Sequence, residues 1–207
     1  MEYSPDNRSL VIMGNIFCLI GKSGAGKDTV FNELIKKNIP GLKPVVTYTT
    51  RPKRVNETEG KEYHFVDENT LHKLEAEGKV IERRTYHTVN GDWNYFTCSI
   101  DLSQSCDYIM IGTPDVVDKL YDYYDDDTVI IIYLELDEKE RLLRCINREE
   151  MQSAPNYSEV CRRFLADEED FYKGRFEKYK RLYRVDSSNS NCVNVSRCEE
   201  IINKCKG

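Results

Sequence analysis

A short glycine-rich segment, placed between an apolar run and a helix-forming run, constrains this chain more than any other feature. Residues 21–29 read Gly-Lys-Ser-Gly-Ala-Gly-Lys-Asp-Thr and follow the apolar run Ile16–Ile20 directly. Glycines allow the backbone to curl so that several N–H groups point inward, and the following helix adds the positive end of its dipole. Lys27 would reach the outer phosphates of a nucleotide as a mobile positive charge. The segment therefore predicts a phosphate-binding loop that opens a helix.

The residue after the lysine is unusual for such a loop. A Ser or Thr at that place normally puts a hydroxyl on Mg²⁺, whereas this chain has Asp28, followed by Thr29. A carboxylate is a hard oxygen ligand, so Asp28 could hold Mg²⁺ directly or through water. Alternatively, Asp28 is a first-turn acid that suits the helix dipole. We expect Mg²⁺ to accompany ATP at Asp28 or Thr29, and the sequence leaves open which of the two serves it.

Bulk properties exclude several classes of protein. The chain has 207 residues and a net charge of -6, which suits one globular domain and argues against a general nucleic-acid binder. The first residues carry no basic region that leads into an apolar core, and no apolar run approaches the roughly 20 residues that span a bilayer. The eight cysteines are scattered without a C-x-x-C pair, so neither a zinc site nor a thioredoxin-type redox site is indicated. We expect a cytoplasmic protein with reduced thiols and no membrane partner.

Apolar runs alternate with helix-like stretches along most of the chain. The expected strands are Ile16–Ile20, Pro44–Tyr48, Tyr108–Ile111 and Val129–Leu134, and the expected helices are Lys27–Lys37, Pro114–Tyr124, Asp137–Glu149, Ser158–Leu182 and Ser196–Lys206. Asp137 and Ser196 are expected N-caps, and Pro114 is an expected first-turn proline. The alternation predicts an α/β protein, with the three-layer fold of P-loop NTPases and a mainly parallel central sheet.

Two segments interrupt this alternation. Within residues 49–106, short stretches with period-2 alternation (Tyr63–Val66, Val80–His87 and Tyr95–Ile100) surround a short helix, Leu71–Glu77. We interpret residues 49–106 as a mixed α/β lobe, inserted into a core that comprises residues 10–48 and 107–207. Residues 148–158 contain Met, Pro, Asn and Ser between two helices, which indicates a short mobile lid.

Two closely spaced arginines follow the second expected strand. The stretch Thr47-Tyr-Thr-Thr-Arg-Pro-Lys-Arg54 places Arg51 and Arg54 three residues apart, after several hydroxyls. Guanidinium groups bind phosphate through two parallel hydrogen bonds and keep their charge at every physiological pH. Open α/β sheets bind ligands at the carboxyl ends of their strands. Arg51 and Arg54 are therefore candidates for a second phosphate site, although a basic surface loop would show the same residues.

Further stretches make a family resemblance specific. Residues 60–66 read G-K-E-Y-H-F-V, residues 80–82 read V-I-E and residues 95–97 read Y-F-T. Together with T-T-R-P-K-R and the phosphate loop, these stretches resemble the guanylate kinases, which move a phosphoryl group from ATP to GMP. The resemblance extends from about Ile16 to Phe171. It implies ATP and GMP or dGMP as substrates, and the sequence indicates no nucleic-acid partner and no particular oligomeric state.

The resemblance also implies roles for individual residues. ATP would contact Gly21, Lys22, Ser23, Gly24, Ala25, Gly26, Lys27, Asp28, Thr29, Arg144 and Arg148, and the acceptor would contact Thr47, Arg51, Arg54, Tyr63, Glu82, Tyr95 and Thr97. Glu82 would bind the guanine edge, and Arg51, Arg54 and Tyr63 would bind the GMP phosphate. Lys27, Arg51, Arg148 and Arg163 would be the catalytic residues. For Arg144, a simple i,i+4 ion pair with Glu140 remains an equal alternative.

The departures from the family pattern mainly affect positions expected to lie near the acceptor base. Guanylate kinases usually carry two acids at the end of the third core strand, where this chain has Ile111 and Thr113. Segment 83–92 is longer than its counterpart, and Phe96 replaces the glycine after the tyrosine of the Y-F-T stretch. Three hypotheses follow: a GMP or dGMP kinase, a kinase for another nucleotide or phosphorylated small molecule, and an inactive guanylate kinase-like binding module. The intact phosphate loop opposes the third.

Overall fold

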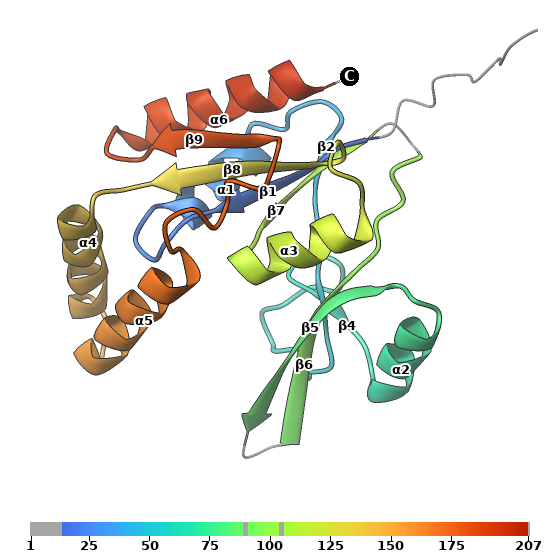
Figure 1. Ribbon diagram of the computed structural model, residues 1–207. Helices are drawn as coiled ribbons and strands as arrows, with labels where there is room; N and C mark the ends of the chain where they lie inside the picture. Colours follow the sequence, from blue (N-terminus) through green and yellow to red (C-terminus); the bar gives the residue numbers. More distant parts are fainter. Residues whose placement is uncertain (1–13, 89–90, 104–105, 207) are drawn as a thin grey trace, which may run out of the picture.

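A five-stranded parallel sheet forms the centre of the computed structural model, which describes residues 14–88, 91–103 and 106–206 (Figure 1). Its strand order is β2-β7-β1-β8-β9, and every neighbouring pair is parallel. The strands are β1 (Ile16–Ile20), β2 (Leu42–Pro44), β7 (Asp107–Ile111), β8 (Val129–Glu135) and β9 (Leu182–Asp186). β1 is buried along its whole length, as expected of a parallel strand that is covered on both faces.

Helices cover both faces of this sheet. α1 (Lys27–Lys36) and α6 (Asn191–Cys205) pack on one face, where Val30, Leu34 and Ile202 join alternate residues of β1 and β8 in one apolar cluster. α3 (Pro114–Tyr123) packs on the other face with Phe176. The predicted three-layer α/β fold with a parallel central sheet is confirmed. No helix in the described ranges is both long and apolar enough to cross a membrane.

The chain leaves the parallel sheet after β2 and builds a second sheet before it returns at β7. This sheet has the order β4-β3-β6-β5, with strands β3 (Tyr48–Thr49), β4 (His64–Phe65), β5 (Val80–Thr88) and β6 (Gly91–Cys98). α2 (Glu68–Ala76) covers one face of it, capped by the Asp67 carboxylate, which accepts the N–H of Thr70. Leu71, Phe96 and Cys98 form the small apolar core of this unit.

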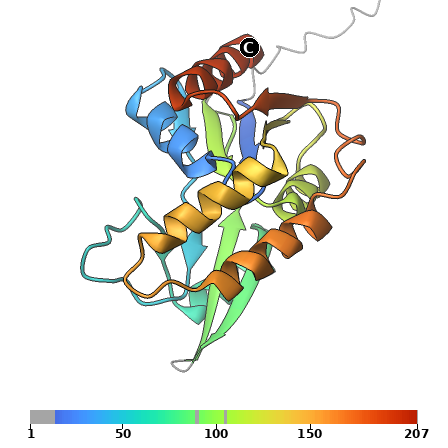
Figure 2. The ribbon, with the colours of Figure 1, turned by 90° about the vertical axis from the view of Figure 1, so that its left-hand side faces the viewer.

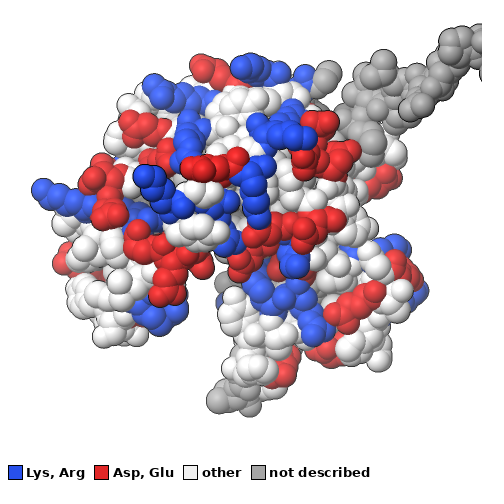
Figure 3. Space-filling view, in the orientation of Figure 1, with Lys and Arg blue, Asp and Glu red and all other residues white. Residues whose placement is uncertain are grey.

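Two helices project from the carboxyl end of the central sheet. α4 (Glu138–Glu150) and α5 (Tyr157–Asp170) lie side by side in Figures 1 and 2, joined by a short turn. The predicted N-cap Asp137 accepts the N–H groups of Lys139 and Glu140, and Pro114 occupies the first turn of α3, so both assignments are confirmed. In the space-filling view, the molecule is hollowed between this helix pair and the β5–β6 hairpin, and acidic and basic side chains are interspersed on that face (Figure 3).

Two predicted elements are wrong. The strand expected at Pro44–Tyr48 is two strands in different sheets, since β2 ends at Pro44 and β3 starts at Tyr48. The helix expected at Ser158–Leu182 ends at Asp170, because Phe171 and Phe176 leave the helical path to pack on Tyr133 of the core sheet. The chain then forms β9, of which only Leu182 lay within the expected helix.

The last helix begins earlier than expected. α6 starts at Asn191, with Ser190 at its N-cap, so Ser196 lies inside the helix and is not a cap. Residues 10–13 of the expected core and residues 89–90 and 104–105 of the expected lobe lie outside the described residues.

Candidate active site

The glycine-rich segment joins β1 to α1 and depends on glycine at two positions. Gly24 and Gly26 have φ angles of 85° and 89°, in the left-handed region that residues with a Cβ rarely adopt. A Cβ on Gly24 would also lie 2.8 Å from the backbone carbonyl oxygen of Arg141. These glycines therefore allow the tight curl of the loop and the close approach of α4 to it.

The ammonium group of Lys27 lies over this loop. Its Nζ donates to the backbone carbonyl oxygens of Gly21 at 2.6 Å and Lys22 at 3.2 Å. Burial lowers the pKa of Lys27 below its usual value, while the nearby carboxylates of Asp28 and Asp167 act in the opposite direction. A partly desolvated cation beside a curl of backbone N–H groups is well suited to hold phosphate oxygens.

A pocket of about 990 Å³ opens above the loop. Nine of the residues predicted at ATP or at the transferred phosphoryl line it: Ser23, Gly24, Gly26, Lys27, Asp28, Thr29, Arg144, Arg148 and Arg163. Ser188, Asn189, Ser190 and Asn191 complete its wall. Ser188, Asn189 and Ser190 lie between β9 and α6, and Asn191 is the first residue of α6. Gly21 and Ala25 are buried beneath the loop and do not belong to this wall.

The three predicted lid arginines reach the pocket from the two projecting helices. Arg144 and Arg148 come from α4, and Arg163 comes from α5. Arg144 donates to Glu140 at 2.5 Å and to the carbonyl oxygen of Ser187 at 3.3 Å, so it forms the i,i+4 pair and lines the pocket at the same time. Arg163 donates to Glu159 at 2.7 Å. The arrangement gathers positive charge opposite the phosphate loop.

A buried ion-pair network, which the sequence did not reveal, ties α5 to the phosphate loop. Arg141 is fully buried and donates to Asp167 at 3.0 Å and to Glu168 at 2.5 Å. The same carboxylates reach the loop, because Asp167 accepts the backbone N–H of Ser23 at 2.8 Å and Glu168 pairs with Lys22 at 2.5 Å. Lys22, expected at ATP, is thus engaged by α5. The network fixes the loop against both projecting helices.

A second pocket, of about 610 Å³, lies between the two sheets, and we call it the acceptor pocket. Its lining residues are Thr47, Tyr63, Arg84, Tyr86, Trp93, Tyr95 and Ile111. Three of them, Thr47, Tyr63 and Tyr95, were predicted to contact the acceptor. The rings of Tyr63 and Tyr95 meet edge to face at 5.5 Å, and the ring of Tyr86 meets Tyr95 at 5.4 Å. An aromatic wall of this kind suits a flat heterocycle.

Arg51 stands next to this pocket with its guanidinium held on several sides. Its Nε donates to the Tyr95 hydroxyl at 3.1 Å, and its two terminal nitrogens donate to the two Glu57 carboxylate oxygens at 3.0 and 2.7 Å. This pairing lowers the pKa of Glu57. A carboxylate and a phosphate both offer paired oxygens to the guanidinium fork, so Arg51 is oriented to bind a two-oxygen anion.

The other predicted acceptor residues occupy different positions. The Glu82 carboxylate accepts the Thr97 hydroxyl at 2.8 Å, and both residues are buried and lie outside the described lining of the acceptor pocket. Arg54 is exposed, and its backbone N–H donates to Glu57 at 2.8 Å. The structure therefore brings Thr47, Tyr63 and Tyr95 together with Arg51, and it leaves the Arg54 side chain outside the described lining of the pocket.

The two residues at the end of β7 that depart from the family pattern serve different purposes. Ile111 lines the acceptor pocket as an apolar wall. Thr113 is the N-cap of α3, where its hydroxyl accepts the N–H of Val116 at 3.4 Å. Phe96 points to the opposite face of its strand, into the core of the smaller unit, where it stacks on Tyr48 at 5.2 Å.

We predict that Thr113→Ala lowers the free energy of unfolding by about 0.5–2 kcal/mol, because the helix loses its N-cap. Urea unfolding would measure the change, and Thr113→Ser, which keeps the hydroxyl, is the matched control. A loss of acceptor affinity in Thr113→Ala without any loss of stability would show that Thr113 acts on the acceptor and not on the helix.

Several residues that line the pockets or support them were not predicted from the sequence. Arg84 and Tyr86 lie two and four residues after Glu82 on β5, and this spacing places them on the same face of the strand. Asp167 and Glu168 were hidden in a helix that was expected to continue as far as Leu182. Within the described ranges, no group of three or more His, Cys, Asp or Glu side chains forms a metal cluster.

Comparison with known proteins agrees with this geometry. Residues 13–95 match the family model described as guanylate kinase. The chain is 36% identical over 91 residues to guanylate kinase from Aromatoleum aromaticum, which covers 44% of this chain and 42% of that protein. It is 41% identical over 70 residues to guanylate kinase from Anaplasma phagocytophilum, which covers 34% of this chain and 33% of that protein. In both cases the matched part is less than half of the relative's length.

The likeness of the fold extends further than the likeness of the sequence. The crystal structure of guanylate kinase from Anaplasma phagocytophilum superimposes with a TM-score of 0.57 and 20% sequence identity, over 94% of this chain and 89% of that one. The resemblance indicated by the motifs is therefore confirmed, and the chain is related to the guanylate kinases in the sequence of residues 13–95 and in the fold of nearly its whole length.

Proposed function

We propose that the protein transfers the γ-phosphoryl group of ATP directly to GMP or dGMP, which yields ADP and GDP or dGDP. One observation carries this proposal: the donor loop and the acceptor pocket are anchored on neighbouring strands. β1, which leads into the phosphate loop, pairs in parallel with β7, and Leu19 lies beside Ile111, which lines the acceptor pocket. Ligands of open α/β sheets bind outside the carboxyl ends of the strands, where these two features meet.

On the donor side, the loop supplies backbone N–H groups and Lys27 supplies charge. The inward curl at Gly24 and Gly26 and the start of α1 would hold the β- and γ-phosphates. Arg148 and Arg163 line the same pocket from the opposite wall, where they would balance charge on the phosphoryl group as it leaves ADP. Phosphoryl transfer needs little covalent chemistry from a protein, so positioning and charge balance are its main tasks.

On the acceptor side, Arg51 would hold the GMP phosphate. An oxygen of this phosphate attacks the γ-phosphorus in line, the bond to the β–γ bridging oxygen breaks, and the electron pair leaves with ADP. Arg51 and the Tyr95 hydroxyl are joined at 3.1 Å, so both are placed to contact the same phosphate. Tyr63 contacts both residues, and its hydroxyl would donate to a remaining phosphate oxygen.

The residues present also fit Mg²⁺. Asp28 and Thr29 supply a carboxylate and a hydroxyl at the wall of the loop pocket, and Mg²⁺ commonly binds through one or two protein oxygens together with phosphates and water. The metal, when bound, neutralises charge on the β- and γ-phosphates.

The α4–α5 pair would act as the closing part of the site. Its turn covers residues 151–156, within the segment 148–158 that the sequence reading assigned to a lid. Closure of α4 and α5 over ATP would bring Arg148 and Arg163 onto the phosphates and exclude water, which limits wasteful hydrolysis.

The proposal is tested by ADP release from Mg-ATP in the presence of one nucleoside monophosphate at a time: GMP, dGMP, AMP, CMP, UMP or dTMP. Turnover restricted to GMP and dGMP supports the proposal. Faster turnover with another monophosphate would replace GMP by that acceptor. ATP binding without turnover on any member of the panel would refute a kinase for these nucleotides and leave a non-nucleotide acceptor or an inactive binding module.

We predict that Arg51→Ala lowers kcat/KM for GMP by roughly 10- to 150-fold, which corresponds to the loss of about 1.5–3 kcal/mol of charge-assisted hydrogen bonding. The KM for ATP is expected to stay near that of the unchanged protein, because Arg51 contacts the acceptor side only. Initial rates at varied GMP and varied ATP measure both values. Lys53→Ala, which removes a nearby exposed cation, is the matched control, and an equal loss in both variants would contradict the assignment of Arg51.

A further inference from the structure

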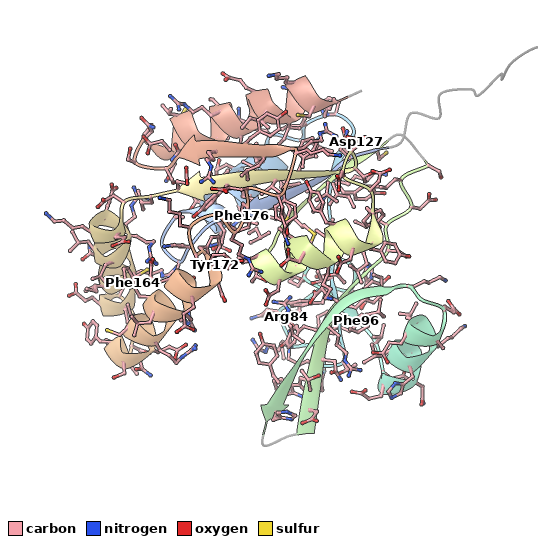
Figure 4. All side chains as sticks on the ribbon, viewed as in Figure 1. Arg84, Phe96, Asp127, Phe164, Tyr172 and Phe176 are labelled. Atoms are coloured by element: carbon pink, nitrogen blue, oxygen red, sulfur yellow. The ribbon has the colours of Figure 1, made fainter. Side chains whose placement is uncertain are left out.

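The β5–β6 hairpin presents a row of side chains that the proposed function leaves mostly unassigned. The antiparallel register places Glu82 opposite Thr97, Arg84 opposite Tyr95, and Tyr86 opposite Trp93. Residues two apart on a strand share a face, so the six side chains lie on one face of the hairpin. Four of them line the acceptor pocket: Arg84, Tyr86, Trp93 and Tyr95. In Figure 4, Arg84 and Phe96 lie on opposite sides of the hairpin.

Glu82 and Arg84 form a pair of opposite charges along this row. Arg84 donates from Nε to Glu82 Oε2 at 3.2 Å and from Nη2 to Oε1 at 3.5 Å. The Glu82 side chain is 7% exposed, whereas the Arg84 side chain is 47% exposed. An arginine has five N–H donors, and these two bonds leave others for a ligand. The guanidinium is thus the charged group of this pair that forms the pocket surface.

We propose that Arg84 binds the O6 and N7 atoms of the acceptor guanine, beside the N1–H and N2–H groups that the family resemblance assigns to Glu82. This inference rests on the proposed function, in which GMP occupies the acceptor pocket. The edge of guanine presents two donors, N2–H and N1–H, followed directly by two acceptors, O6 and N7. The two carboxylate oxygens of Glu82 are acceptors, and the N–H groups of Arg84 beside them are donors, so the pair complements this order. The fork of arginine on O6 and N7 is the commonest specific contact of a protein with guanine.

The same pair explains how the pocket would reject adenine. Adenine carries an amino group where guanine carries O6, so a donor would meet the Arg84 guanidinium and the pair would be left partly unsatisfied. Tyr86 and Trp93 stand beside Arg84 on the same face and supply aromatic surface for the flat base. Arg84 is therefore a specificity-determining residue of the acceptor pocket.

Fluorescence of Trp93 provides a direct test. It is the only tryptophan of the chain and it lines the acceptor pocket, so its emission reports acceptor binding without any need for turnover. The full chain is titrated with GMP and with 7-deaza-GMP, which lacks only the N7 acceptor. Arg84→Ala removes the fork, and Arg84→Lys keeps the charge without the fork. Arg83→Ala is the matched control, because Arg83 lies on the other face and pairs with Glu75 at 2.8 Å.

The unchanged protein and Arg83→Ala should bind GMP about tenfold more tightly than 7-deaza-GMP, as expected for one contact of an arginine fork with guanine. Arg84→Ala and Arg84→Lys should bind the two nucleotides equally. Equal binding by the unchanged protein, or a preference that persists without Arg84, would overturn the inference. Turnover of GMP without tighter binding of GMP than of 7-deaza-GMP would refute only this inference. Tighter binding of GMP without turnover would support this inference and refute the kinase proposal.

Discussion

Lys27→Met is expected to lower kcat for phosphoryl transfer by about 100- to 1000-fold, the effect typical of removing one preorganised charge from a transition state. The Lys27 ammonium lies over the curl of the loop, bonded to the carbonyl oxygens of Gly21 and Lys22. Methionine retains the length of the side chain and removes its charge. We expect the thermal midpoint to change little, because the substitution preserves the glycines that shape the loop. Initial rates of ADP release with saturating ATP and GMP measure the loss.

Lys36→Met is the matched control for this prediction. Lys36 lies in the last turn of the same helix, is exposed, and pairs only with Glu33 among its described contacts. It should keep full activity. A Lys27→Met protein with more than about a tenth of the normal kcat would show that the loop does not supply the main stabilisation of the transferred phosphoryl group.

Arg141→Ala is expected to lower the free energy of unfolding by about 3–5 kcal/mol, the effect typical of breaking a buried ion pair at one partner. Arg141 is fully buried, and it is the cation between Asp167 and Glu168. Its guanidinium also lies 3.7 Å from the centre of the Phe164 ring. Without Arg141, Asp167 would lose its described cation, and Glu168 would keep only Lys22. Urea unfolding, followed by circular dichroism, measures the change.

Two variants sharpen this second prediction. Lys139→Ala removes an exposed cation from the first turn of the same helix and should cost less than about 1 kcal/mol. Asp167→Asn introduced into the Arg141→Ala protein removes one uncompensated charge and should restore part of the stability. If Arg141→Ala cost no more than Lys139→Ala, the network would contribute little to the attachment of α5.

The core of the fold could be predicted because its signals are local. The run Ile16–Ile20, the glycines that follow it and the Asp137 cap each identify an element within a few residues. The break after Pro44 could not be predicted, since Val45 and Val46 continue the apolar run although the chain there crosses from one sheet to the other. The end of α5 depends on the packing of Phe171 and Phe176 against Tyr133, which is a long-range contact.

The candidate site also has residues that could be predicted from the sequence and residues that could not. The loop residues and Arg51 belong to contiguous motifs, and the structure places them at two neighbouring pockets. Arg84 was missed because a period-2 pattern marks which side chains share a face and does not say which face borders the core sheet. Asp167 and Glu168 were missed because their partner Arg141 lies on another helix, 26 and 27 residues away.

The central claim is tested most directly with ATP that carries ³²P in its γ-phosphate. The measurement determines which product receives the label. The full chain is incubated with this ATP, Mg²⁺ and GMP, and the products are separated. Direct transfer between the two pockets predicts that nearly all released label appears in GDP, in step with ADP. Label that appears instead as inorganic phosphate, or that stays in ATP while GMP binds, would contradict the account.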